Sequence, residues 1–320
     1  MSILMFAGCS GSSGKASAGS PESAGTEASR NSSSETSASI KFNADSAYSY
    51  VHRQVQFGPR VPNSDAHAKT AAWLESELKR HGAEVILQKD KVTAFDGTEL
   101  SMTNIMGSYH PDKTDRLLLL AHYDTRPWAD KDPDSANHNK PIDGANDGAS
   151  GVGILLETAR MLGKSTAPDI GIDILFVDCE DYGSEGDDDS WALGAKYFAT
   201  HPIKPGYRPV KAILLDMVGG KGAVFPAEYF SRQNAPDLDD SIRRAAAQAG
   251  HSSLFPLKIG GAVTDDHIEL IKAGIPAVDI IDYRESGFCP TWHTMSDNID
   301  NIDKETLRAV GETLFSYILK

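Results

Sequence analysis

Four short and almost entirely apolar runs constrain the fold of this chain more than any other feature. They lie at residues 116–121, 172–177, 212–215 and 277–281. Such short runs are typical of strands that are buried on both faces of a parallel sheet. Helical patterns follow at 149–163, 190–200, 236–249, 265–273 and 304–319. Strands that alternate with helices predict a single α/β domain, in which a mixed but mostly parallel sheet carries helices on both faces.

The segment before these runs adds two helices and two extended stretches. We expect helices at 45–57 and 64–81, and strands at about 84–92 and 100–107. Ser64 has the side chain of an N-cap, and Gly82 is placed to end its helix. No internal repeat or second domain boundary is visible, so we expect one catalytic domain over residues 41–320.

Residues 1–40 have a different composition. Ser, Gly and Ala dominate residues 10–40, where Ile40 is the only large apolar residue. Such a stretch cannot bury enough apolar surface to offset its ordering entropy, so we predict a disordered linker. The short apolar stretch before Gly8-Cys9 resembles the end of a bacterial lipoprotein signal, although no Lys or Arg precedes it. This resemblance implies a lipid on Cys9 and a place in the bacterial cell envelope, periplasmic or at the outer membrane; the alternative is an incidental cysteine.

The charge and the cysteine content exclude several classes of protein. The net charge is −14, whereas nucleic-acid binding needs a basic face. No run of 18 apolar residues occurs, so the expected membrane contact is only through a lipid on Cys9. Three cysteines are too few for a disulfide scaffold. Whether Cys179 and Cys289 pair is left open, and we expect a monomer.

Acids and histidines follow each of the four apolar runs. Because ligands of open α/β sheets bind at the carboxyl ends of the strands, these side chains can converge on one cleft. Carboxylates and imidazoles without a thiolate cluster suit zinc or a similar divalent ion. Any one of them alone is better explained as a solvated loop acid or a helix cap. Six of them at successive strand ends predict a metal site: His122, Asp147, Glu180, Asp181, Asp216 and His293.

Competing catalytic signatures are incomplete. The loop Gly148-Ala149-Ser150-Gly151-Val152 lacks the last glycine of a serine-hydrolase elbow. The sequence also lacks a complete dinucleotide or phosphate loop and the paired histidines of a helix-borne zinc protease. The run Asp187-Asp188-Asp189 is interpreted as a solvated loop. A metal site built from strand ends is therefore the preferred hypothesis.

Five blocks of the sequence together resemble the glutaminyl-peptide cyclotransferases, or glutaminyl cyclases, which share the fold of the zinc aminopeptidases. The most specific are Asp-Asp-His-Ile at 265–268 and Trp-His-Thr-Met at 292–295. The other blocks are His122-Tyr123-Asp124, the glycine-rich loop 144–151 and Asp178-Cys179-Glu180-Asp181. The resemblance spans about residues 50–319, with the blocks in the family's order. The glycine-rich loop is shared with the aminopeptidases and does not separate the two activities.

The resemblance implies a role for each matching residue. It implies one zinc ion, a proton-transferring glutamate, a carboxylate pair beside the substrate amine and two aromatic walls. The ligands would be Asp147, Asp181 and His293; the acid/base Glu180; the pair Asp216 and Asp265; and the walls Trp191 and Trp292. Animal cyclases have glutamate at the position of Asp181 and histidine at that of Asp279. No role is therefore carried over to Asp279, and the bacterial cyclases are the better match.

The implied reaction converts the N-terminal glutamine of a peptide or protein to pyroglutamate and releases ammonia. The substrate carries both nucleophile and electrophile, so a pocket that holds the bent conformer lowers the entropic barrier. Zinc would polarise the γ-carbonyl and Glu180 would carry the proton. A two-zinc aminopeptidase is the alternative, with His122 and Asp216 holding a second ion and Asp147 bridging. An inactive binding protein on the same fold is a third reading.

Overall fold

The computed structural model describes residues 41–165 and 168–319. The predicted lipid site at Cys9 and the predicted linker at 10–40 lie outside these residues. Within the described ranges, no helix has the combination of length and apolar composition that crossing a membrane requires.

A six-stranded sheet forms the centre of the domain, in the order β1-β2-β4-β3-β5-β6. The strands β4, β3, β5 and β6 run parallel to one another, whereas β1 and β2 run antiparallel to each other and β2 runs antiparallel to β4. The prediction of a mostly parallel mixed sheet is confirmed. The bounds are β1 Glu84–Thr93, β2 Glu99–Tyr109, β3 Arg116–His122, β4 Gly171–Val177, β5 Lys211–Asp216 and β6 Ala277–Ile281.

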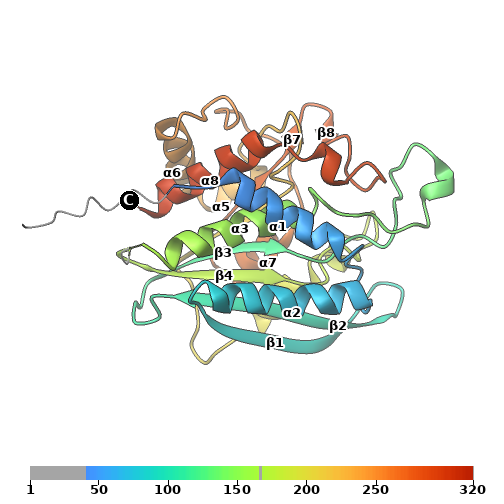
Figure 1. Cartoon of the computed structure of the whole chain (residues 1–320), viewed down its shortest axis with the longest axis horizontal. Helices are drawn as coiled ribbons and strands as arrows, with labels where there is room; N and C mark the ends of the chain where they lie inside the picture. The colour runs from blue at the N-terminus through green and yellow to red at the C-terminus, as the bar shows by residue number, and fades with distance from the viewer. Residues whose placement is uncertain (1–40, 166–167, 320) are drawn as a thin grey trace, which may run out of the picture. The chain divides into compact units, whose positions relative to one another are not determined.

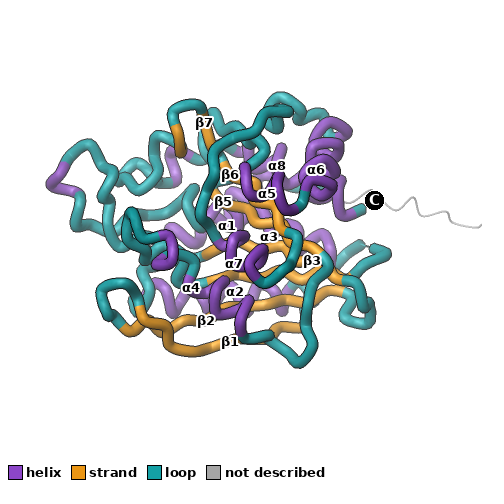
Figure 2. Tube along the Cα trace, turned by 180° about the vertical axis from the view of Figure 1, so that it is seen from behind, coloured by secondary structure: helices purple, strands orange, loops and turns teal. Residues whose placement is uncertain are grey.

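Helices cover both faces of this sheet (Figures 1 and 2). Alternate residues of β3 show why: Leu117 and Leu119 share one core with α1, α3 and α8, while Leu118 and Leu120 share another with α4 and α7. A strand whose two faces are both buried must be apolar throughout. The helices are α1 Ala44–Gln56, α2 Asp65–Arg80, α3 Ala149–Leu162, α4 Leu193–Thr200, α5 Tyr229–Asn234, α6 Pro236–Gln248, α7 Asp266–Lys272 and α8 Lys304–Ile318.

The local signals for α2 are confirmed. The Ser64 side chain accepts the backbone N–H of His67, and Gly82 follows the helix with φ of 87°. A positive φ suits glycine because it has no Cβ to clash with the backbone. The helix predicted at about 190–200 is present but starts three residues later: α4 begins at Leu193, because Ala192 has a left-handed backbone (φ 55°) that a continuous helix cannot contain.

Some short elements were not predicted. They are α5, the hairpin of β7 (Tyr283–Arg284) and β8 (Gly287–Phe288), and 3₁₀ turns at Ser135–Asn137, Asp188–Ser190 and Ile299–Asn301. None is long enough to show a hydrophobic period. Cys179 and Cys289 are buried free thiols and do not pair with each other.

Candidate metal centre

The eight side chains to which the resemblance assigns a role in the cyclase reaction all line one cavity of about 330 Å³, whereas His122, which was also expected in this cleft, is not among its lining residues. They come from distant parts of the chain, and most follow the carboxyl end of a strand or precede a helix. The residues are Asp147, Glu180, Asp181, Trp191, Asp216, Asp265, Trp292 and His293. The predicted convergence on one cleft is therefore observed, whereas the individual roles stay predictions.

Asp147, Asp181 and His293 form the first group of potential metal ligands. Nε2 of His293 lies 3.1 Å from Oδ1 of Asp181 and 3.5 Å from Oδ2 of Asp147. All three residues are buried, yet both oxygens of Asp181 and Oδ2 of Asp147 have no hydrogen-bond partner. Buried carboxylate oxygens without partners are costly unless a cation or proton compensates them. Two carboxylates and one imidazole around a shared point are a ligand set that fits zinc.

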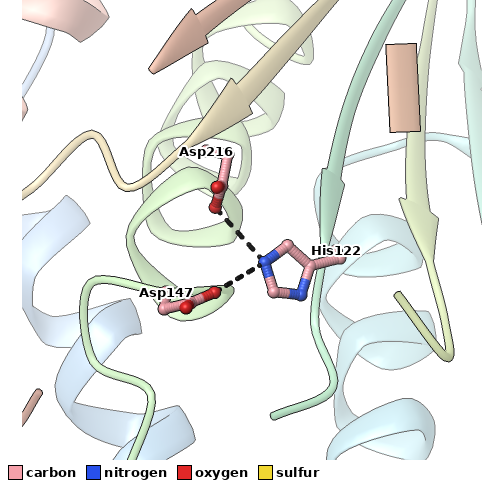
Figure 3. Close-up of side chains that lie close together, drawn as sticks. All are labelled: His122, Asp147 and Asp216. Carbon is pink, nitrogen blue, oxygen red and sulfur yellow. Dashed lines mark hydrogen bonds and ion pairs between the residues drawn. The ribbon is translucent and has the colours of Figure 1, made fainter. Parts of the chain in front are cut away.

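His122, Asp147 and Asp216 form a second group, which shares Asp147 with the first (Figure 3). Nε2 of His122 lies 3.2 Å from Oδ1 of Asp216 and 3.1 Å from Oδ1 of Asp147. Burial disfavours the charged imidazole, but the neighbouring carboxylates of Asp124, Asp147 and Asp216 outweigh it and raise the pKa of His122 well above its ordinary value. His122 and the two carboxylates thus form a second set of side chains that could hold a cation.

A third buried group contains Asp265, His267 and Asp279. Nε2 of His267 is 3.1 Å from Glu228, and its Nδ1 is 3.8 Å from Asp279. His267 therefore faces a carboxylate on each side. Asp279, the position at which animal cyclases have histidine, lies within β6 and is not among the residues that line the cavity.

The start of α3 places Asp147 between the first two groups. Gly148 has φ of 85°, and a Cβ on Gly151 would meet the carbonyl oxygen of Leu215 at 2.2 Å. Only glycine allows the first turn of α3 to approach β5 this closely. Asp297 fixes the preceding loop, because its carboxylate accepts the backbone N–H groups of Asn146 and Asp147 at 2.7 and 3.1 Å.

Asp124 has the same function for the loop after β4. Its two carboxylate oxygens accept the backbone N–H groups of Glu180 and Asp181, each at 3.1 Å. The sequence analysis gave no role to Asp124 or Asp297. The available signal was their position in or next to the blocks of the resemblance: Asp124 ends the block His122-Tyr123-Asp124, and Asp297 follows the block at 292–295 by two residues.

Four residues with left-handed backbone conformations adjoin the cavity. Cys179 precedes Glu180, Ala192 follows Trp191, Met217 follows Asp216, and His293 itself has φ of 54°. A non-glycine residue in this region costs on the order of 1–3 kcal/mol and persists only where its surroundings enforce it. These turns aim the functional side chains inward, and the sequence gives no direct sign of them.

Burial shifts the pKa values of the carboxyl groups in the cavity. It raises the pKa of Glu180 well above its ordinary value, and the charges of Asp181 and Asp265 act in the same direction. Burial, together with the charge of Asp216, raises the pKa of Asp265 to about 7. The predicted carboxylate pair is thus close enough for one charge to oppose the other, as expected for groups that share a proton.

The two tryptophans both stack on His293. The ring centroid of Trp292 lies 3.9 Å from that of the imidazole, and the centroid of Trp191 lies 6.0 Å away, with interplanar angles of 26° and 16°. The indoles give the cavity apolar walls beside the first ligand group. Such walls exclude water and strengthen electrostatic interactions inside the cavity.

Fold and site together define a class of protein: an α/β enzyme of the zinc-peptidase type, with buried aspartates and histidines at the carboxyl edge of its sheet. Residues 104–318, which make up more than half of the chain, match peptidase family M28. The chain belongs to peptidase family M28.

Within this family, the resemblance to bacterial glutaminyl cyclases is confirmed. The glutaminyl cyclase of Porphyromonas gingivalis is 51% identical, with 86% of this chain and 97% of that chain covered and a TM-score of 0.85. A Zn-dependent exopeptidase from Parabacteroides distasonis is 49% identical over 88% of this chain and 99% of its own, with a TM-score of 0.85. The glutaminyl-peptide cyclotransferase of Bos taurus is 26% identical over 82% of this chain and 78% of its own length.

Proposed function

We propose that this enzyme converts N-terminal glutamine of peptides or proteins to pyroglutamate and releases ammonia. One observation carries the proposal: a single cavity contains a cation site with unpartnered oxygens, the buried Glu180 and the carboxylate pair Asp216 and Asp265. The similarity to proteins named glutaminyl cyclases supports it.

We assign zinc to Asp147, Asp181 and His293. These residues leave ligand positions free for a substrate, which is typical of catalytic zinc sites. When bound there, zinc supplies Lewis-acid polarisation of the γ-carbonyl oxygen.

Glu180 carries the proton. The α-amine nitrogen forms a bond to the side-chain amide carbon, and the bond from that carbon to the amide nitrogen breaks. A proton must leave the amine and reach the departing nitrogen. A buried carboxyl group with a raised pKa can accept the first proton and deliver it to the second site.

Asp216 and Asp265 hold the amine. Burial raises the pKa of both groups, and the charge of Asp216 raises that of Asp265 further. A proton shared by the pair would let it offer both a hydrogen-bond donor and an acceptor to the amine. Trp191 and Trp292 confine the side chain of the substrate, which favours the bent conformer that cyclisation requires.

The test is incubation of the purified protein with a peptide that begins with glutamine, read by mass spectrometry. Cyclisation removes about 17 mass units as ammonia, from the stoichiometry of lactam closure. A matched peptide with N-terminal alanine should stay unchanged. Removal of the whole first residue from both peptides would instead establish aminopeptidase activity.

A two-zinc aminopeptidase is the second candidate. The shared position of Asp147 in two ligand groups favours it, as does the similarity to a Zn-dependent exopeptidase. Zinc content separates the two: one tightly held ion per chain supports the cyclase, and two ions support the peptidase, in which His122 and Asp216 would hold the second ion.

A further inference from the structure

Arg126 occupies a central place beside the cation site, although the mechanism above gives it no role. Its guanidinium is buried and lies in the loop after β3. Nη1 donates hydrogen bonds to the backbone carbonyls of Asp181 and Gly183, each at 3.1 Å. The arginine thereby holds the backbone of one proposed metal ligand.

The same guanidinium holds Asp130 in a bidentate pair. Nε and Nη2 of Arg126 lie 2.9 and 2.8 Å from the two carboxylate oxygens of Asp130. A fork-to-fork pair fixes the orientation of the carboxylate as well as its position. This matters because the Asp130 side chain is 31% exposed and would otherwise be free to rotate into solvent.

Asp130 lies behind the second proposed ligand, His293. Oδ1 of Asp130 is 3.6 Å from Nδ1 of His293, and this buried nitrogen has no hydrogen-bond partner. Nε2 of the same ring faces Asp147 and Asp181. When Nε2 binds a metal, Nδ1 carries the proton, and a carboxylate behind it commonly fixes the tautomer and the ring orientation.

Two further contacts tie this loop to the same side of the site. The backbone N–H of Lys131 donates to the carbonyl oxygen of His293 at 3.1 Å, where the histidine has its left-handed backbone. The guanidinium carbon of Arg126 also lies 4.7 Å from the ring centroid of Trp191, which stacks on His293. One arginine therefore touches the surroundings of both ligands and of one aromatic wall.

We propose that Arg126 and Asp130 are a positioning pair for the metal centre. Asp130 orients the imidazole of His293. Arg126 fixes the position of the Asp130 carboxylate relative to the backbone of Asp181. The proposal rests on the metal centre assigned above, but not on the identity of the substrate. Neither residue contacts the reacting atoms, so their contribution acts through the metal ligands.

The experiment measures zinc release from the full-length, zinc-loaded protein to a chromophoric chelator. Asp130→Asn keeps the size of the side chain but removes its charge. Arg126→Lys keeps the charge but removes the two guanidinium N–H groups that bind the carboxylate of Asp130. We expect both variants to lose zinc roughly 10- to 100-fold faster than the unsubstituted protein. Asp134→Asn is the matched control, because Asp134 is an exposed residue of the same loop that only caps a 3₁₀ turn; it should release zinc at the original rate.

Thermal unfolding in excess chelator separates positioning from a general structural role. Asp130→Asn should unfold within a few degrees of the unsubstituted protein when both are metal-free. Zinc release at the original rate in Asp130→Asn would overturn the proposal, as would equal acceleration in Asp134→Asn. His293→Ala tests the centre itself, because undiminished zinc content in this variant would refute both the metal centre and the positioning pair. If zinc release is accelerated in Asp130→Asn but the unsubstituted protein shows no cyclase activity, only the proposed reaction is refuted.

Discussion

Glu180 and Asp181 are neighbours in the sequence, yet we assign them different roles in the site. The left-handed turn at Cys179 and the two hydrogen bonds to Asp124 fix the backbone between them. Asp181 belongs to the first ligand group and has two buried oxygens without a hydrogen-bond partner, while Glu180 lines the cavity as a group with a raised pKa. Environment rather than residue type thus separates a metal ligand from an acid/base.

Replacement of Glu180 by glutamine tests this division of labour. Glutamine has the same shape but cannot carry the proton, so we expect kcat to fall about 10²- to 10⁴-fold. Zinc content should stay at the original level, because Glu180 is not a member of the ligand group. Ammonia release and metal analysis measure the two quantities; full turnover in this variant would remove Glu180 from the mechanism.

Asp265 predicts a pH dependence of stability. Its pKa is raised to about 7 from 3.8, so between about pH 4 and 7 the folded protein holds a proton that the unfolded chain has released. The free energy of unfolding of the metal-free protein should therefore fall as pH rises through this window.

In Asp265→Asn, the slope of the free energy of unfolding against pH should flatten by up to about 1.4 kcal/mol per pH unit, which corresponds to one proton. Urea unfolding at pH 5, 6 and 7 in excess chelator measures the slope. An unchanged slope would show that Asp265 is ionised throughout this range.

At the scale of elements, the contact of α3 with the sheet decides where the ligands meet. Gly151 lies against the carbonyl of Leu215 and the side chain of Ala121, so β3, β5 and the start of α3 touch there. Asp147 precedes this turn, while His122 and Asp216 end the two strands. The same packing that builds the core therefore sets the distances between the side chains of the second ligand group.

Alanine at Gly151 should disturb the site through this contact. A Cβ would lie 2.2 Å from the Leu215 oxygen, so α3 must shift, at a cost of about 1–3 kcal/mol of stability. We expect weaker zinc binding and lower kcat as well as a lower Tm. Gly153→Ala is the control: its Cβ would meet Val51 and Ala47 of α1 instead, so it should lower Tm but leave zinc affinity intact.

At the scale of the whole molecule, the parallel strands bring together side chains that are up to 171 positions apart, from His122 to His293 (293 − 122 = 171). Every strand of the sheet, its covering helices and every residue named in the site lie within residues 41–319. The monomeric state, the lipid on Cys9 and the location in the cell envelope stay predictions.

A chain that begins at residue 41 should therefore keep the activity and stability of the full-length protein. We expect its kcat/KM to lie within about twofold and its Tm within a few degrees of the full-length values, because ordering of residues 1–40 by burial is not expected from their composition. Kinetics and thermal unfolding of both chains provide the comparison. A large loss of activity would show that residues 1–40 take part in the fold or the site.

The sequence by itself determined the helices and strands, and the chemistry of the carboxyl edge of the sheet. Apolar runs located four of the six strands, extended stretches located the other two, and caps such as Ser64 located helix ends, because these signals act within a few residues. The acids and histidines after those strands identified the cavity residues, since the carboxyl ends of parallel strands meet at one edge. The short helix α5 escaped prediction because six residues show no period.

Only the tertiary structure decided how the site is held. The sequence showed neither the place of β4 between β2 and β3 nor the packing of α3 at Gly151. It also gave no sign that Asp130, which pairs with Arg126, lies beside His293, which is far along the chain. These features arise from contacts between residues that are distant in sequence. Local patterns do not encode such contacts, because their energy depends on the packing of the whole domain.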